Sequence, residues 1–141
     1  MPVRLIFRQR MRCKQVFDVL RRKYVALTPE EGVRQHFVAY LIAEKGYPQG
    51  LMANEVELKC GVKKLRCDTV LYSKTLTPFM IIEYKAPTVQ LSQKVFNQLL
   101  DYNSILGVKY LVMTNGQSLM CCVVNEGKYE FLTTLPDYAD L

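Results

Sequence analysis

Apolar and polar residues alternate with two different periods along the chain, and the changes of period divide it into elements. Thr28, Pro29 and Glu31 form a helix start, with a cap, a proline suited to the first helical position and a capping-box acid. Apolar side chains then recur at helical spacing, at Val33, Phe37, Tyr40 and Leu41. The pattern predicts a helix that begins at Thr28 and ends by Gly46 or Pro48.

Three strand-like runs follow, at residues 51–59, 65–72 and 78–85. The third contains Phe79-Met80-Ile81-Ile82, a continuous apolar run that is typical of a central strand. Residues 91–106 then predict a second helix, with Ser92 as its cap and Gly107 as its stop.

The rest of the chain predicts a buried strand at residues 110–113 and a final hairpin of residues 119–124 and 129–132. The order is therefore helix, three strands, helix, strand and hairpin. It indicates an α/β fold with a mixed β-sheet and helices packed on it, in a single domain over residues 1–141.

Residues 1–26 form a basic, partly apolar lead-in, in which we expect Val16, Val19 and Leu20 to make a short helical turn. Asp18 is the only acid in this stretch, which holds eight basic residues: Arg4, Arg8, Arg10, Arg12, Lys14, Arg21, Arg22 and Lys23. The formal net charge of the chain is +6. This charge favours an anionic partner such as nucleic acid, although a solvated basic face would look the same.

Composition also excludes several classes of protein. No long apolar run lacks charges, so we expect no membrane span, and the N-terminus lacks a signal-peptide pattern. We therefore expect a cytoplasmic protein. The five cysteines contain no Cys-x-x-Cys, and His36 is the only histidine, so zinc binding and a disulfide framework are both disfavoured.

Glu83-Tyr84-Lys85 ends the most hydrophobic strand, and its charged side chains share one face because they are two residues apart. Two other Glu-x-Lys tripeptides occur in the chain, so the tripeptide alone is no signal. Only its place at the end of the most hydrophobic strand distinguishes Glu83-Tyr84-Lys85 from the others. If residues 65–72 and 78–85 form a hairpin centred between Thr75 and Leu76, Asp68 lies opposite Glu83. The same register pairs Val70 with Ile81 and Tyr72 with Phe79.

Two facing carboxylates repel each other unless a cation lies between them, and hard oxygen ligands suit Mg²⁺ or Mn²⁺. Such an ion activates water and stabilises charge on a phosphate, and Lys85 could orient the water or stabilise that charge. The sequence therefore predicts a phosphodiester hydrolysis site at Asp68, Glu83 and Lys85. The alternative is an ordinary ion pair of Lys85 with one of the two acids.

This pattern resembles the PD-(D/E)xK nuclease superfamily, whose core order matches residues 28–113. The resemblance implies a restriction-endonuclease-like fold, with Asp68 as the second-strand acid and Glu83 and Lys85 as the (D/E)xK pair. Branches of the superfamily carry Gln-x-x-x-Tyr on the next helix, here Gln98 and Tyr102. Many members also use an acid on the first helix, here Glu31 or Glu30.

Four motifs narrow the resemblance to the N-terminal nuclease domain of type I restriction enzyme R subunits, over residues 22–138. They are Tyr24 to Glu31, Glu83-Tyr84-Lys85-Ala86-Pro87, Gln98-x-x-x-Tyr102-Asn103 and Tyr110-x-x-x-Thr114-Asn115-Gly116.

The resemblance implies Mg²⁺-dependent DNA cleavage, with restriction-system subunits as further partners. The metal ligands would be Asp68, Glu83, the Tyr84 carbonyl and Glu31. Lys85 would assist the water, and Gln98 and Tyr102 would support the site. The chain has no Walker A motif and no room for a motor domain. Two alternatives therefore remain: a non-catalytic nucleic-acid-binding or assembly module with the same fold, and an unrelated protein-interaction domain that uses the terminal hairpin.

Overall fold

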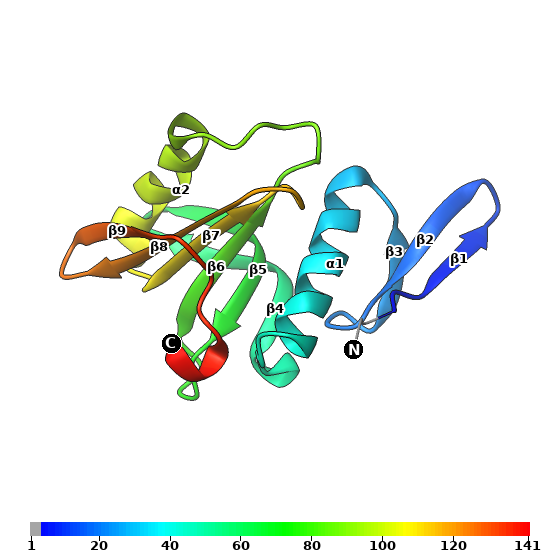
Figure 1. The fold of residues 1–141 in the computed structure, drawn as a ribbon, viewed down its shortest axis with the longest axis horizontal. Helices are drawn as coiled ribbons and strands as arrows, with labels where there is room; N and C mark the ends of the chain where they lie inside the picture. The colour runs from blue at the N-terminus through cyan, green and yellow to red at the C-terminus, as the bar shows by residue number, and fades with distance from the viewer. Residues whose placement is uncertain (1–3) are drawn as a thin grey trace.

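The computed structural model describes residues 4–141 and contains two β-sheets, with helix α1 between them (Figure 1). In chain order the elements are β1 (Phe7–Arg10), β2 (Cys13–Asp18), β3 (Lys23–Ala26), α1 (Pro29–Ala43), β4 (Met52–Cys60), β5 (Lys63–Tyr72), β6 (Pro78–Tyr84), α2 (Gln93–Leu106), β7 (Tyr110–Thr114), β8 (Leu119–Asn125) and β9 (Lys128–Leu132). Short 3₁₀ helices lie at Gln49–Leu51 and Tyr138–Asp140. No helix in the described range is long and apolar enough to span a membrane.

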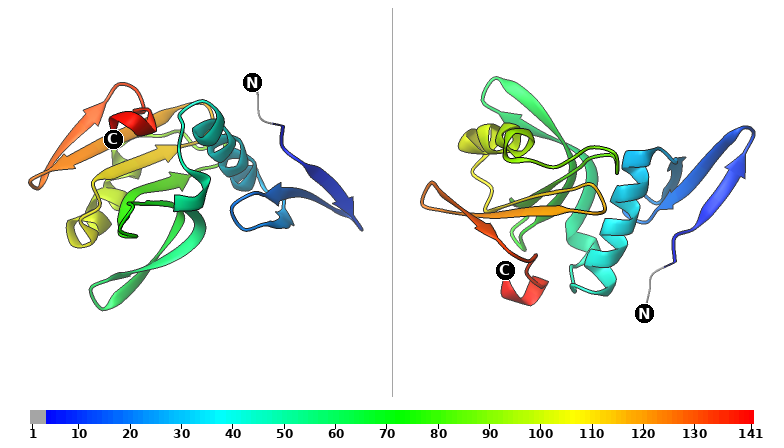
Figure 2. Two further views of the ribbon diagram at one scale, coloured as in Figure 1. Left: turned by 90° about the horizontal axis from the view of Figure 1, so that it is seen from below. Right: turned by 45° about the horizontal axis from the view of Figure 1, so that its top comes forward.

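The main sheet has six strands in the order β4-β5-β6-β7-β8-β9. Every neighbouring pair is antiparallel except β6 and β7, which are parallel and joined through α2. Helix α2 covers one face of this sheet and α1 packs against the other, so the mixed α/β fold is confirmed (Figure 2). Each face has its own apolar core, centred on residues such as Ile82 on the α1 side and Ile81 on the α2 side.

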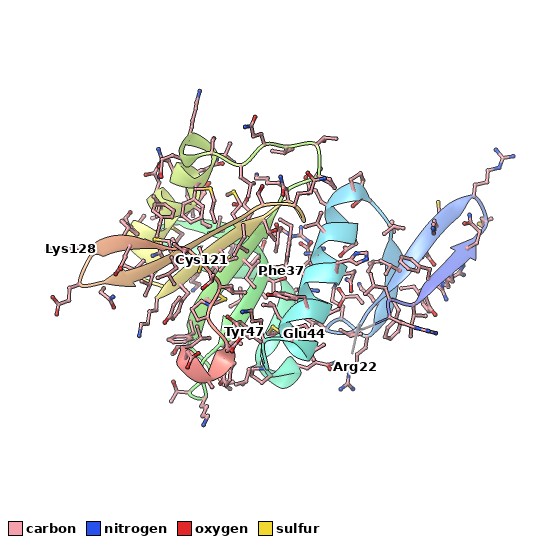
Figure 3. All side chains as sticks on the ribbon, in the orientation of Figure 1. Arg22, Phe37, Glu44, Tyr47, Cys121 and Lys128 are labelled. Carbon is pink, nitrogen blue, oxygen red and sulfur yellow. The ribbon has the colours of Figure 1, made fainter. Side chains whose placement is uncertain are left out.

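Helix α1 begins as the sequence predicts, because the Thr28 hydroxyl accepts a hydrogen bond from the Glu31 backbone N–H at 3.1 Å. The predicted apolar stripe is only partly correct, since Tyr40 is exposed. The helix has weak amphipathicity because it lies between two sheets and is buried on two sides. Phe37 points from α1 toward the main sheet (Figure 3).

The prediction of a helical turn near Val16 is wrong. Strands β1, β2 and β3 form an antiparallel three-stranded sheet on the far side of α1, and Val16 lies fully buried in β2. Val16 and Asp18 are both buried, while Phe17 between them is less so, which is the period of a strand. Residues 1–3 of the predicted lead-in lie outside the described residues.

The predicted register of the β5–β6 hairpin is confirmed at its centre, where Val70 pairs with Ile81. It is wrong near the turn: Tyr72 pairs with Pro78 instead of Phe79, because an irregularity between Leu71 and Tyr72 shifts the ladder by one residue.

The predicted ends of α2 are confirmed by their hydrogen bonds and backbone angles. The Ser92 hydroxyl accepts from the Val95 N–H at 3.2 Å, and Gly107 has a φ of +67° at the C-terminal end of the helix. The final hairpin, β8–β9, also forms and pairs Asn125 with Lys128 at its turn.

Candidate functional site

Asp68 and Glu83 lie on neighbouring strands at the same end of the main sheet. Thr69 pairs with Ile82, so the same register places Asp68 beside Glu83, and an Asp68 carboxylate oxygen accepts a hydrogen bond from the Tyr84 N–H at 2.9 Å. Glu83 alternates with Ile82 and Tyr84 of the α1 side and therefore faces α2, whereas Asp68 borders one cavity beside α2 and another beside α1.

A cavity of about 180 Å³ opens between this end of the sheet and α2. Asp68 and Glu83 line it from the strands, and Gln98 and Tyr102 line it from the helix. The structure thus brings four predicted site residues to one small polar cavity. Arg66, also in its wall, adds a cationic side chain.

Lys85 follows directly after β6, and its N–H donates to the Thr114 carbonyl at 2.9 Å. Its ammonium nitrogen lies 3.6 Å from a Glu83 carboxylate oxygen. Both side chains are largely covered, at 26% and 34% exposure, so this pair differs from a freely solvated surface ion pair.

Burial raises the pKa of both Asp68 and Glu83 above the usual carboxyl range. Lys85 lowers the pKa of Glu83 in part, whereas the nearby Asp68 raises it. The Tyr84 N–H and Arg34 lower the pKa of Asp68 without cancelling the effect of burial. The two carboxylates therefore lack full compensation for their charge, which is the electrostatic condition that a bound cation relieves.

Glu31 lies on α1, and its carboxylate is already occupied. It accepts two hydrogen bonds from Arg34, at 2.7 Å each, one from Arg21 at 2.7 Å and one from Gln35 at 3.1 Å. Burial acts to raise the pKa of Glu31, but these hydrogen bonds outweigh it and leave the pKa lowered. Glu31 is thus compensated by protein groups, unlike Asp68.

Within residues 4–141, no three His, Cys, Asp or Glu side chains form a group that could hold a metal ion. Asp68 and Glu83 therefore supply a two-carboxylate site, without Glu31 as a third member. The donor chemistry, hard oxygens with open positions, still fits Mg²⁺ or Mn²⁺, which retain several waters in protein sites.

Arg34 is a buried site residue that the sequence reasoning missed. Besides its bonds to Glu31, it donates to the Asp68 carbonyl at 3.0 Å and lies 2.8 Å from a Glu55 carboxylate oxygen. Burial acts to lower its pKa, but these two acids outweigh that effect and raise it. The spacing of Arg34 from Val38 and Leu41 places the three side chains on one face of the helix. This spacing could have indicated Arg34 from the sequence, because a charged side chain on a buried face requires charged or polar partners.

Glu55 was also missed, and nothing local in the sequence indicates it. Its neighbours Asn54 and Val56 pair with Thr69 and Cys67, so Glu55 lies opposite Asp68. It has a φ of +57°, an unusual conformation for a residue with a side chain. Such strain persists where surrounding contacts enforce it, as the ion pairs to Arg34 and Arg66 do here.

Tyr84 separates the two charged residues of the tripeptide and points to the opposite face of the sheet. Its ring contacts Phe37 of α1 edge-on, with centroids 6.0 Å apart. It is buried, and its hydroxyl has no hydrogen-bond partner among the described residues. This packing fixes the end of β6, so that Glu83 and Lys85 both project toward α2.

Residues 29–136 match the model of a family described as the type I restriction enzyme R protein N terminus. The chain belongs to this family. Among solved structures, it is similar to a fragment of a putative HsdR subunit of a type I restriction enzyme from Vibrio vulnificus YJ016. The TM-score is 0.57 at 21% sequence identity, which supports a shared fold.

That match covers 78% of this chain and 24% of the Vibrio chain, so this chain spans about a quarter of its relative. No curated protein matches the chain.

Proposed function

We propose that this R-subunit N-terminal domain is a metal-dependent DNA endonuclease of the PD-(D/E)xK type. The observation that carries the proposal is the approach of Asp68 and Glu83 at one cavity, with Lys85 beside Glu83. Family membership supports DNA and restriction-system subunits as partners. Asp68, Glu83 and the Tyr84 carbonyl would hold Mg²⁺ or Mn²⁺.

When bound, such an ion supplies an activated water and stabilises negative charge on the phosphate. The protein groups around it then have separate tasks. The Asp68 and Glu83 carboxylates would hold the cation, and their burial would strengthen the attraction. Lys85 brings a positive charge to the reacting phosphate, while Gln98 and Tyr102 form the α2 wall against which the substrate is oriented.

The direct test compares cleavage of DNA by the wild type and Lys85→Ala in Mg²⁺ or Mn²⁺. This variant removes the Lys85 ammonium group, a positive charge already positioned at the reacting phosphate. Its loss should lower the rate of DNA cleavage by about 10²- to 10³-fold. Lys74→Ala is the matched control, because Lys74 is an exposed lysine in the turn at the opposite end of β6. Equal cleavage by the wild type and Lys85→Ala would contradict the proposal.

A non-catalytic DNA-binding or assembly module is the second candidate. It is favoured by the absence of a third acidic ligand in the described residues and by the pairing of Glu83 with Lys85. This candidate predicts salt-dependent DNA binding without metal-dependent cleavage. An unrelated protein-interaction domain predicts neither, so the binding assay separates the remaining two alternatives.

A further inference from the structure

The net positive charge of the protein comes from its N-terminal residues, up to the end of β3. Residues 4–26 hold eight of the 19 Lys and Arg residues and one of the 13 Asp and Glu residues, a net charge of +7. Residues 27–141 hold the other 11 basic and 12 acidic residues, a net charge of −1. The domain that carries the candidate site thus offers a polyanion no net attraction of its own.

Strand β2 presents one face to α1 at its buried end, whereas all four residues of β1 are exposed. Val16 and Asp18 are buried on the inner face, whereas their neighbours alternate to the outside. Pairing between the strands places one set of side chains together on the outer face: Arg8, Arg10, Cys13, Gln15, Phe17, Tyr24 and Ala26. Every charged residue in that set is an arginine.

Contacts across the sheet order this outer face. The Arg8 guanidinium lies 3.9 Å from the centre of the Tyr24 ring and donates to the Gln15 side chain at 2.6 Å. Phe17 packs edge-on against Tyr24, with centroids 5.2 Å apart. Arg10 and Arg12, by contrast, lie exposed at the β1–β2 turn. The outer face therefore combines an arginine stacked on an aromatic ring with exposed guanidinium groups. Aromatic rings and arginines can stack on nucleic-acid bases, and guanidinium groups can bind the backbone.

The inner face is fixed to the domain by Asp18. Its carboxylate accepts from the Arg21 side chain and from Asn54 of β4 at 2.9 Å. Asn54 in turn accepts from Thr69, the residue next to Asp68, at 2.6 Å. This chain of buried hydrogen bonds holds the three-stranded sheet in a defined position relative to the candidate site.

The outer face and the candidate site lie toward the same end of the molecule. Ala26, at the end of β3, and Asp68 line one cavity of about 300 Å³. The ends of β3 and β6 and the start of α1 lie at this end of the fold, and the β1–β2 hairpin projects to the side of α1 away from the main sheet (Figures 1 and 2). A DNA strand held at Asp68 can therefore continue onto the three-stranded sheet.

We infer that the outer face of the β1–β2–β3 sheet binds the phosphate backbone of DNA beside the cleavage site. The inference rests on the proposed function, because it names the surface that holds the substrate of that site. Its charge complements DNA, and the arginines of its hairpin turn have the exposure that phosphate contacts require.

The test measures binding of a short labelled DNA duplex to the full chain by fluorescence anisotropy, in EDTA and at several salt concentrations. Arg10→Glu/Arg12→Glu should weaken binding by at least about 10-fold and reduce the slope of log K against log salt by about two. Arg10→Gln/Arg12→Gln should give a smaller loss in the same direction. Arg10 ends β1 and Arg12 lies in the turn that follows, both exposed, so thermal unfolding should match the wild type.

The charge-matched control is Lys74→Glu/Lys128→Glu, which changes the net charge equally. Both residues are exposed, and Lys128 lies at the left end of the molecule in Figure 3, whereas the β1–β2 hairpin projects at the right end. This control should change Kd far less. Wild-type binding by the hairpin variant, or equal losses in both double variants, would overturn the inference.

Lys85→Ala separates this inference from the proposed function. It should lose much less duplex binding in EDTA than Arg10→Glu/Arg12→Glu does, while losing cleavage in Mg²⁺. A wild type that binds through the hairpin but never cuts would support the DNA-binding surface and contradict the nuclease proposal.

Discussion

Asp68 is held through two of its groups, each bound by another part of the chain. Its side chain lines the cavity, one carboxylate oxygen accepts from the Tyr84 N–H, and its carbonyl accepts from Arg34. The conformation of this one residue therefore depends on β6 and on α1 together. Arg34 connects it further to Glu31 and Glu55, so that an ion-pair network lies directly beneath the candidate site.

Removal of the Arg34 charge should destabilise the protein. Arg34→Met leaves Glu31 and Glu55 with fewer partners in a buried setting, which should cost about 3–5 kcal/mol in the free energy of unfolding measured in urea. Arg66→Ala is the matched control. It also removes a partner of Glu55, but Arg66 is 71% exposed, and its pair should contribute less than about 1 kcal/mol. Equally small losses in both variants would contradict a structural role for Arg34.

The same network predicts a pH dependence with a definite sign. The folded-state pKa of Glu31 is lowered, so its stabilising effect is present above the ordinary carboxyl pKa and is lost as the pH falls through the lowered value. The acid-induced loss of stability should therefore be shallower in Arg34→Met than in the wild type.

Helix α2 forms one wall of the candidate site, and its ends determine which side chains reach the cavity. Gly107 ends it in a left-handed conformation, which costs a residue with a Cβ about 1–2 kcal/mol. Gly107→Ala should lower the free energy of unfolding by that amount in urea denaturation. Gly50→Ala, where the added methyl group meets nothing within 4 Å, should cause no comparable loss. Equal losses of stability in Gly107→Ala and Gly50→Ala would contradict the need for a left-handed residue at the end of α2.

The elements with strong local signals were predictable from the sequence. Thr28 and Ser92 cap their helices as predicted, and the apolar run of β6 forms a central strand. The β5–β6 register followed from the hydrophobic pattern and therefore placed Asp68 beside Glu83. The pairing of Tyr72 failed because the ladder irregularity depends on the conformation of the turn.

The elements that depend on distant partners were not predictable. The N-terminal sheet buries Asp18, whose carboxylate accepts from the Leu20 and Arg21 N–H groups, from the Arg21 side chain and from Asn54, 36 residues away. Glu55 combines a positive φ with ion pairs to Arg34 and Arg66. The contacts to Asn54 and Arg34 have no signature within a short window of sequence, since they form only in the folded protein.

At the scale of the whole molecule, the net positive charge and the candidate site have separate locations. The three-stranded sheet carries the net positive charge, and the main sheet carries the carboxylates. Helix α1 lies between them and contributes Arg34 to the network under the site. In the proposed function, DNA would be attracted by the three-stranded sheet and would be cut at Asp68 and Glu83, on two inner strands of the main sheet.

The central claim is that Asp68 and Glu83 share a divalent cation. The most direct test is anomalous diffraction from crystals of the full chain soaked with Mn²⁺ at neutral or higher pH, because the raised pKa of both carboxyl groups makes a low pH unfavourable for metal binding. We predict an anomalous peak within coordination distance of both carboxylates, and its loss in Asp68→Asn. Crystals that bind Mn²⁺ elsewhere but show no peak at these residues, or the same peak in Asp68→Asn, would contradict the account.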